Sequence, residues 1–230
     1  MIVTYIRSSS YNNYDYCQLQ YFITYVLGHR STSGKKAQLG TIVHKVMECL
    51  AVCKKRLQGR QTKTMKVTDD AIGEIKFTPK NLYTKTFVAK LLKRSYEHYT
   101  ENCVHDYTNA DYKFCEKSVD QALTYNDGQF DPRERKIVEA EPQFDIPIEE
   151  DWFEYKMPNG ESVTGQLAIK GTIDLVTEVE DGVIEVIDWK TGRRLNWATG
   201  EEKTYEKLIE DPQLLLYNYA ISKLFPQYDQ

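Results

Sequence analysis

The sequence of 230 residues contains no long apolar run, so it offers no segment that could cross a membrane as a helix. Such a segment needs roughly 18 consecutive apolar residues. The N-terminal stretch MIVTYIRSSS also lacks the hydrophobic region of a signal peptide. These absences exclude an integral helical membrane protein. We therefore expect a protein, cellular or phage-encoded, that works inside the cell in the cytoplasm.

Cysteine is scarce, with five residues and no C-x-x-C pair: Cys17, Cys49, Cys53, Cys103 and Cys115. An odd number of cysteines without this spacing favours free thiols over a metal site. In an intracellular protein we expect these thiols to be mostly reduced and buried. The sequence also contains no helix-turn-helix pattern, internal repeat or low-complexity linker, so it shows no separate module for reading a base sequence.

What the sequence does contain is an uneven distribution of charge behind its net charge of −4. Residues 1–100 hold 17 Lys and Arg against 6 Asp and Glu, whereas residues 101–230 hold 13 against 28. The first part can attract a polyanion, and the second holds the carboxylates that a cation site would need. Two solvated faces that neutralise each other would explain the same pattern, so charge alone leaves both interpretations open.

The length and the hydrophobic content of 41% suit one soluble domain with a sizeable core. Apolar periodicity predicts helices over about 8–27, 39–57, 81–100 and 111–124, with a loop over 28–38 and an irregular or mobile segment over 58–80. From about residue 137 the pattern is strand-like, with turns at Pro158-Asn159-Gly160 and Asp181-Gly182, and a last helix over about 201–224 breaks or restarts at Pro212. We predict a single α/β domain over residues 1–230, with a mixed central sheet flanked by helices, a helical N-terminal region and a partly basic helical excursion over about 51–125.

The first predicted helix carries one stripe of large side chains at spacings of three and four: Tyr14, Cys17, Tyr21 and Tyr25. Serines at its start can cap the first turn. A stripe of this kind more often packs in a core than stacks on nucleic-acid bases, so we expect it to be buried.

The densest chemical signal is the segment GTIDLVTEVEDGVIEVIDWKTGRR, residues 171–194. Asp188 and Lys190 are two residues apart on the predicted return strand, so their side chains share a face. Asp174 joins that face only in one register. A two-residue loop at 181–182 would put it on the other face, whereas a three-residue loop pairs 179 with 183 and sets Asp174 opposite Asp188. We predict the second register, with Gly182 left-handed, because it gathers all three charges.

Two carboxylates on one face are unfavourable unless a cation or a proton neutralises them. Their hard oxygens favour Mg²⁺ or Mn²⁺, which would acidify water and screen a phosphate. Lys190 would orient the attacking water or stabilise the charge of the transition state. The alternative is an exposed hairpin with these charges in solvent. It is weakened because apolar residues line both faces of the return strand, namely Val183, Ile184, Val186, Ile187 and Trp189.

Two further pairs of residues lie four apart and share a helix face. In GTIVHKVMECL they are His44 and Glu48, a candidate metal ligand and its supporting carboxylate. In PQLLLYNYA they are Gln213 and Tyr217, which could bond a phosphate or a base of DNA. Either pair alone is more often structural, so each gains weight only from the other segments.

Taken in order, these segments resemble the RecB-like branch of the PD-(D/E)XK nuclease superfamily. The matching residues are Gly40, His44 and Glu48, then Gly171 and Asp174, then Asp188, Lys190, Thr191 and Gly192, and finally Gln213 and Tyr217. The opening helix, with Ser10, Tyr14, Cys17 and Tyr21, is also similar to the start of that branch. The resemblance touches residues 10–50 and 139–219, and four motifs in order are far more specific than any one. Glu141 stands where such proteins often carry an acidic residue, and we assign it no role.

The resemblance implies a metal held by His44, Asp174 and Asp188, with the carbonyl of Trp189 as a further ligand, and Lys190 as the catalytic lysine. Some relatives hold an iron–sulfur cluster through one early and three late cysteines. Here Cys17 could match the first, but no cysteine follows Cys115, so we expect no cluster. The chain ends at Gln230, where relatives often continue, which fits a minimal member or a truncated chain.

The leading hypothesis is therefore a Mg²⁺- or Mn²⁺-dependent DNA exonuclease in recombination, repair or phage DNA processing. A structure-selective endonuclease on the same core is the second hypothesis, and a DNA-binding or assembly module that does not cut is the third. The intact set of Asp174, Asp188 and Lys190 speaks against the third, since a pure binder gains nothing from carboxylates beside phosphate. The exonuclease is favoured because the sequence shows no base-reading element.

Overall fold

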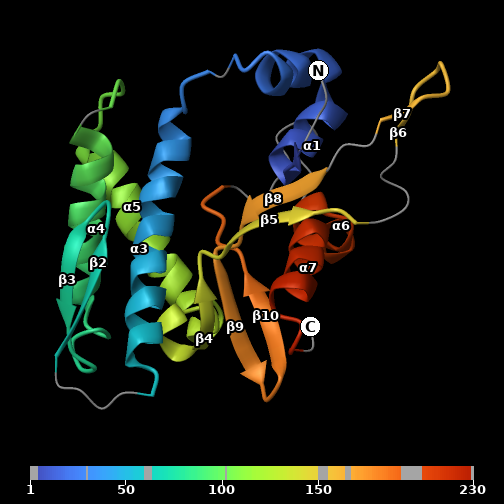
Figure 1. Cartoon of the computed structure of the whole chain (residues 1–230). Coiled ribbons are helices and arrows are strands. Elements are labelled where there is room, and N and C mark those ends of the chain that lie inside the picture. Colours follow the sequence, from blue (N-terminus) through green and yellow to red (C-terminus); the bar gives the residue numbers. More distant parts are fainter. Residues whose placement is uncertain are drawn as a thin grey trace. The chain divides into compact units, whose positions relative to one another are not determined.

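The computed structural model describes residues 5–29, 31–59, 64–101, 103–149, 155–163, 167–192 and 204–228 (Figure 1). Contacts divide the chain into two compact units. The first unit comprises Met1–Thr32, Gln143–Thr172 and Arg194–Gln230, and the second comprises Ser33–Pro142 and Ile173–Arg193. Each unit is therefore assembled from segments that lie far apart in the sequence.

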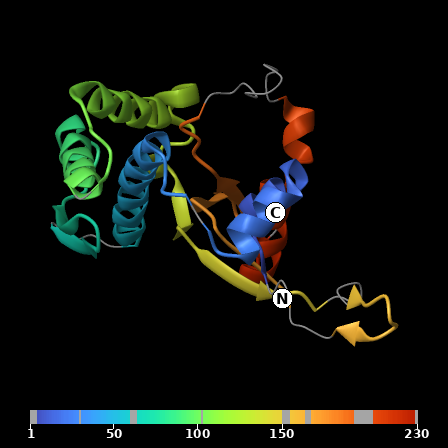
Figure 2. The same ribbon diagram turned by 90° about the horizontal axis from the view of Figure 1, so that it is seen from above.

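The second unit is organised around one long helix, α3 (Lys35–Leu57), in which ten residues are buried. The helix starts four residues before the predicted start at 39, because residues 35–38 are good helix formers and follow Gly34 in an extended conformation. Two further helices pack on α3, as Figure 2 shows: α4 (Lys85–Glu101) and α5 (Asn109–Thr124). The structure thus confirms the three helices that periodicity predicts in this part of the chain.

The segment expected to be irregular contains a β-hairpin instead. β2 (Met65–Asp69) pairs antiparallel with β3 (Gly73–Phe77), and the carboxylate of Asp69 closes the turn by accepting two backbone hydrogen bonds of 2.9 Å. The prediction of irregular structure over 58–80 is wrong here. The prediction failed because only a few apolar side chains alternate with the lysines and threonines. That pattern is too weak to indicate two strands that are buried on one face. Residues 60–63 of this segment lie outside the described residues.

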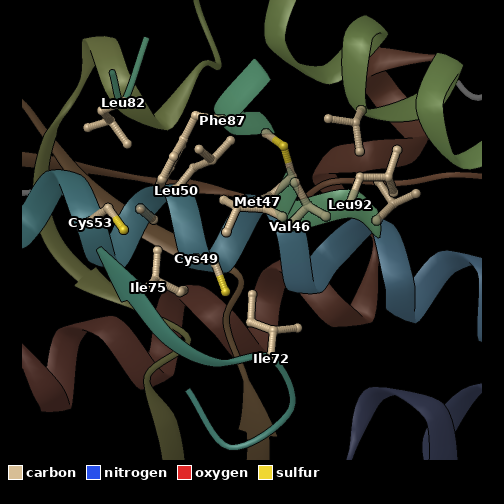
Figure 3. Close-up of a cluster of buried hydrophobic side chains, with 14 of the residues drawn as sticks. Val46, Met47, Cys49, Leu50, Cys53, Ile72, Ile75, Leu82, Phe87 and Leu92 are labelled. Atoms are coloured by element: carbon tan, nitrogen blue, oxygen red, sulfur yellow. The ribbon is translucent and has the colours of Figure 1, made fainter. Parts of the chain in front are cut away.

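The core of this unit lies between α3 and the elements around it (Figure 3). Ile72 and Ile75 from the hairpin, together with Phe87 and Leu92 from α4, converge on the α3 side chains around Leu50. Leu50 is completely buried, so its replacement by alanine would cost about 2–5 kcal/mol of stability. This packing makes α3 a rigid base for the residues that it presents to the candidate site.

An antiparallel sheet completes the second unit, in the order β10 (Val183–Ile187), β9 (Leu175–Glu180) and β4 (Lys136–Ala140). It is preceded by two short 3₁₀ turns, η2 (Tyr125–Gly128) and η3 (Pro132–Glu134). The side chain of Gln58, at the end of α3, bonds both the N–H and the carbonyl of Ile137 in β4, at 2.6 and 2.8 Å. Helix and sheet are therefore fixed to each other through the side chain of Gln58 and the backbone of Ile137.

The β9–β10 hairpin has the predicted register near Asp174 and Asp188, but its turn differs from the predicted one. Val183 pairs with Glu180, so the loop has two residues, and the prediction of a three-residue loop is wrong. The next pair is Ile184 with Glu178, which leaves Val179 as an extra residue in a β-bulge. The bulge shifts the register by one, so that the last pair is 187 with 175 and the positions 188 and 174 follow it. Gly182 has a φ of +79°, as predicted.

The first unit contains a mixed sheet, in which β8 (Ala168–Thr172) lies between β1 (Tyr5–Ile6) and β5 (Gln143–Pro147). β1 is parallel to β8, and β5 is antiparallel to it. Two helices of this unit pack on each other, α1 (Ser8–Tyr16) and α7 (Pro212–Leu224). A short helix, α6 (Tyr205–Ile209), comes before α7, so the helical structure is interrupted and restarts at Pro212, as predicted. A small hairpin, β6 (Tyr155–Lys156) and β7 (Ser162–Val163), turns at the predicted 158–160.

The N-terminal helical region is broken, and its tyrosine stripe is not core. α1 ends before Cys17, which is extended, and is followed by α2 (Gln18–Tyr21) and a π-helical turn, η1 (Phe22–Val26). The prediction of a buried stripe is wrong: the side chain of Tyr14 is 49% exposed, and no residue of α2 or η1 is buried. The rings instead contact one another at 5.3–5.4 Å, and a periodic pattern cannot distinguish such contacts from core packing.

Candidate active site

The predicted catalytic residues lie at the ends of adjacent strands in the second unit. Asp174 directly precedes β9, and Asp188 and Lys190 follow β10. Oδ2 of Asp174 accepts a hydrogen bond of 2.8 Å from the backbone N–H of Trp189. This bond joins the chain that enters β9 to the chain that leaves β10, so the two aspartates belong to one rigid arrangement.

Each aspartate has a nitrogen partner within the site. Nδ1 of His44, from α3, lies 3.3 Å from Oδ1 of Asp174. Nζ of Lys190 lies 2.9 and 2.6 Å from the two carboxylate oxygens of Asp188. The structure thus brings together four residues that the sequence analysis selected from three separate segments.

Burial and mutual charge make this site strongly electrostatic. Burial raises the pKa of Asp188, Asp174 adds to that rise, and Lys190 and His44 oppose it. Burial alone would lower the pKa of His44, but the hydrogen bond and the charge of Asp174 outweigh it, and that pKa is raised. The two aspartates therefore create a site in which positive charge is favourable.

The glycine of the first motif contacts the threonine of the third. A Cβ on Gly40 would lie 3.0 Å from Oγ1 of Thr191, closer than an ordinary van der Waals contact. Gly40 therefore lets the segment after β10 approach α3 closely. That approach brings the Asp188–Lys190 segment to the helix that carries His44.

A second group of charges on the same helix was missed by the sequence analysis. Lys45 forms ion pairs with Glu48 and with Asp69 of the β2–β3 hairpin. The i,i+3 spacing of Lys45 and Glu48 is a signal that could have been used. The contribution of Asp69 could not be found from sequence, because it depends on the hairpin.

Glu141 lies between the two groups of charges. Its N–H donates to the carbonyl of Asp174 at 3.1 Å, and its carboxyl group is close enough to Glu48 for the two charges to interact. Burial first, and then the charge of Glu48, raises the pKa of Glu141 to about 7. Its φ of +47° is a strained conformation for a residue other than glycine. Such strain beside a cluster of buried carboxylates is typical of functional sites.

Gln213 and Tyr217 lie in the first unit, where they form a structural chain of hydrogen bonds. The amide of Gln213 donates to the hydroxyl of Tyr217 at 2.6 Å, and that hydroxyl donates to the carbonyl of Thr172 at 2.8 Å. The buried ring of Tyr217 meets Phe144 edge to face, and Phe144 covers Gly171, where a Cβ would be only 2.4 Å from that ring. The pair thus fixes α7 to β8, and its contact with DNA stays a prediction.

The donor chemistry of the site fits a hard divalent cation. Two carboxylates and an imidazole are ligands that Mn²⁺ and Mg²⁺ accept, and Asp188 is buried where its ionised form needs positive charge. Within the described ranges, no three His, Cys, Asp or Glu side chains are arranged as a metal-binding group. Here His44 and the N–H of Trp189 hold the oxygens of Asp174, and Lys190 holds those of Asp188. The ligand set therefore stays a prediction.

The cysteines are all free thiols, and three of them are buried: Cys49, Cys53 and Cys115. Burial raises the pKa of Cys53 and of Cys115 to about 12, so both are protonated and inert at neutral pH. Cys17 and Cys103 are partly exposed. The expectation of buried thiols is confirmed for Cys49, Cys53 and Cys115.

The fold and the site together define an α/β core with an aspartate and a D-x-K sequence at adjacent strand ends. The chain belongs to the PD-(D/E)XK nuclease superfamily, whose family model matches residues 8–230. The structure and this match confirm the predicted fold class. Comparisons with curated proteins and with solved structures give no significant match. In the part of the chain that the structure describes, no helix is long and apolar enough to span a membrane.

Proposed function

We propose that this protein is a Mg²⁺- or Mn²⁺-dependent deoxyribonuclease of the RecB-like branch, formed by a single nuclease domain over residues 1–230. Its proposed reaction is hydrolysis of phosphodiester bonds from a DNA end, in recombination, repair or phage DNA processing. The observation that carries the proposal is the convergence of His44, Asp174, Asp188 and Lys190 at two strand ends of a PD-(D/E)XK chain.

Each residue of the site has a role that follows from its surroundings. Asp174, Asp188 and His44 would hold the metal ion, with the carbonyl of Trp189 as a further oxygen ligand. When bound, the ion supplies positive charge against the phosphate and makes water more acidic. The side chain of Lys190 is 57% exposed although it bonds Asp188, so a phosphate oxygen can reach its ammonium group. Lys190 would stabilise the negative charge that grows on the phosphate or orient the attacking water.

Glu48 would act through its neighbours and not on the substrate. It forms an ion pair with Lys45, and its charge acts on Glu141, whose N–H bonds the carbonyl of Asp174. Loss of this carboxylate should therefore change the charge around Glu141 first. In this proposal Glu48 positions the site and keeps the local charge in balance.

The preference for DNA ends is supported by the distribution of positive charge and by the sequence. An open groove of about 590 Å³ in the second unit is lined by Lys55, Arg56 and Lys66, of which Lys55 is paired with Glu139 and Lys66 with Glu74. Such a surface suits contact with the phosphate backbone, which carries no sequence information directly. Base reading needs an element that enters a groove of the duplex, and the sequence shows no such element.

Cleavage of matched linear and circular DNA tests the proposed reaction. The purified protein should degrade end-labelled linear DNA with Mn²⁺ or Mg²⁺, and neither EDTA-treated protein nor Asp188→Asn should do so. A covalently closed circle of the same sequence should resist. Cutting of the circle at a rate near that of linear DNA would overturn the exonuclease and favour the endonuclease. If the protein binds DNA but cleaves neither single-stranded nor double-stranded DNA, the hypothesis of a DNA-binding module that does not cut would be favoured.

Binding of Mn²⁺ tests the ligand assignment separately. Calorimetry on Asp188→Ala should lose most of the binding heat seen for the parent protein. Asp181→Ala is the matched control, because Asp181 is an exposed turn residue of the same unit. Unchanged binding of Mn²⁺ by Asp188→Ala would remove Asp188 from the metal site.

A further inference from the structure

The first unit contains a cavity that is lined by positive charge and by no carboxylate. Its volume is about 170 Å³, and its polar lining includes Arg7, Ser8, Ser9, Lys170, Thr172 and Tyr217. All of these residues belong to the first unit, and neither Arg7 nor Lys170 belongs to the motifs of the candidate active site. The cavity therefore needs its own explanation.

Both cations of this cavity also lie near one aromatic ring, that of Tyr5. The guanidinium carbon of Arg7 is 5.7 Å from the centre of the Tyr5 ring, and Nζ of Lys170 is 5.4 Å from the same centre. Lys170 is also paired with Asp145 at 2.6 Å, and the side chain of Asp145 is 60% exposed. A solvent-exposed ion pair is weak, so an anion in the cavity can compete for Lys170. Two cations that line one small cavity favour an anion in it.

The start of α1 adds to this positive potential. Ser8 and Ser9 belong to the first turn of the nine-residue helix, where backbone N–H groups have no acceptor within the helix. The helix dipole places partial positive charge at the same end. The hydroxyl of Ser10 caps this end through the backbone of Arg7, at 2.8 and 2.9 Å, so the Arg7 side chain is not needed for the cap.

A second cavity shares Arg7 and Ser9 with the first. Its volume is about 310 Å³, and the rest of its lining is polar and uncharged, including Asn13, Gln20, Thr24 and Tyr25. The carboxamide oxygen of Asn13 is buried and has no hydrogen-bond donor among the described residues. A buried acceptor of this kind is unfavourable until a donor reaches it. The amino groups and ring N–H groups of nucleobases are such donors.

We propose that these two neighbouring cavities bind one strand of DNA, with a backbone phosphate between Arg7 and Lys170 and the adjoining nucleoside against Asn13 and Tyr25. The identification of the ligand as DNA rests on the proposed function. The charged cavity supplies the contact with the backbone, and the uncharged cavity supplies donors and acceptors for the nucleoside. Tyr217 forms part of the wall of the first cavity, where its bond to Thr172 keeps β8 in place.

Equilibrium binding of a short labelled single-stranded oligodeoxynucleotide, followed by fluorescence anisotropy in EDTA, tests this site without cleavage. Arg7→Ala and Lys170→Ala should each weaken binding several-fold. Each should also reduce the slope of log K against log salt concentration by about 0.7, the value for one lost phosphate contact on a single strand. Arg7→Lys should restore most of the slope because it restores the charge. Lys223→Ala is the control, since Lys223 is an exposed lysine of α7 outside both cavities.

Asn13→Ala tests the uncharged cavity independently. It should weaken binding of the oligonucleotide and leave the salt slope at the parent value, because it removes no charge. Thermal unfolding of each variant verifies that the fold is retained. Inorganic phosphate should compete only weakly, since it lacks the nucleoside. Competition by inorganic phosphate as effective as that of the oligonucleotide would identify free phosphate as the ligand and overturn the strand assignment.

Parent-like affinity and slope in folded Arg7→Ala and Lys170→Ala would overturn the proposal, and so would an equal loss in Lys223→Ala. Because binding is measured without metal, it tests the strand site separately from the proposed nuclease activity. If the variants bind normally but the parent protein cleaves DNA, only the strand site is refuted. If the variants lose binding but the parent protein cleaves no DNA, only the nuclease activity is refuted.

Discussion

The carboxylate of Asp174 and the backbone N–H of Trp189 form a hydrogen bond of 2.8 Å between the two strand ends of the candidate site. The other oxygen of Asp174 lies 3.3 Å from His44. Asp174 therefore has two functions that a substitution can separate. One of its oxygens holds the segment that carries Asp188 and Lys190, and in the proposed nuclease its charge would help to bind the metal ion.

Substitution of Asp174 by alanine and by asparagine should separate these functions. Asp174→Ala should lower the free energy of unfolding by about 1–3 kcal/mol, because the N–H of Trp189 loses its acceptor. Asp174→Asn should lose much less stability, because its amide oxygen can still accept that bond. Both variants should lose binding of Mn²⁺, since the charge is gone. Urea unfolding and calorimetry measure the two effects, and equal stability of Asp174→Ala and the parent would contradict the structural function.

The contact between Gly40 and Thr191 gives a second prediction. Alanine in place of glycine inside a helix usually stabilises a protein by about 1 kcal/mol. In the Thr191→Ala background, Gly40→Ala should show that gain, because the obstructing hydroxyl is absent. In the parent background the gain should disappear or change sign, because Oγ1 of Thr191 lies 3.0 Å from the new Cβ. A double-mutant cycle by urea unfolding measures the difference, and a coupling energy of zero would refute the contact.

Much of the fold could be predicted from the sequence because its long helices are strongly periodic. α3, α4 and α5 lie close to their predicted ranges, and Pro212 restarts the last helix because its ring prevents continuation from the preceding turn. The shared face of Asp188 and Lys190 follows from the period of two in a strand. Local rules of this kind do not depend on the rest of the molecule.

Features that depend on packing could not be predicted. The β2–β3 hairpin is buried on one face by α3 and α4, and its sequence alone has too few apolar residues to indicate it. The bulge at Val179 changes the register without any glycine or proline to mark it. The ion pairs of Lys45 with Glu48 and Asp69 join a helix to that hairpin. Each of these features depends on which helices and strands pack together, and the periodicity of the sequence does not contain that information.

The basic groove of the second unit gives a prediction about the salt dependence of duplex binding. Arg56→Glu should reduce the slope of log K against log salt concentration by about 0.9 or more, because one phosphate contact is lost and a repulsive charge is added. Adding Lys55→Glu, and Lys54→Glu beside it in the last turn of α3, should flatten the slope further. Lys113→Glu on α5 is the control, since Lys113 is exposed in the same unit and outside the groove. If the slope is the same in these variants as in the parent protein, these residues do not contact DNA and form only a solvated face.

The rate of DNA cleavage by Lys190→Ala tests the central claim most directly. In single-turnover reactions on end-labelled linear DNA with Mn²⁺, this variant should be slower than the parent by roughly a hundredfold or more, the effect of losing one strong transition-state contact. Its affinity for DNA should stay near the parent value, because many phosphate contacts share the binding. Lys113→Ala serves as the control and should cleave normally. Cleavage by Lys190→Ala at the rate of the parent would contradict the assignment of this site as the centre of a nuclease.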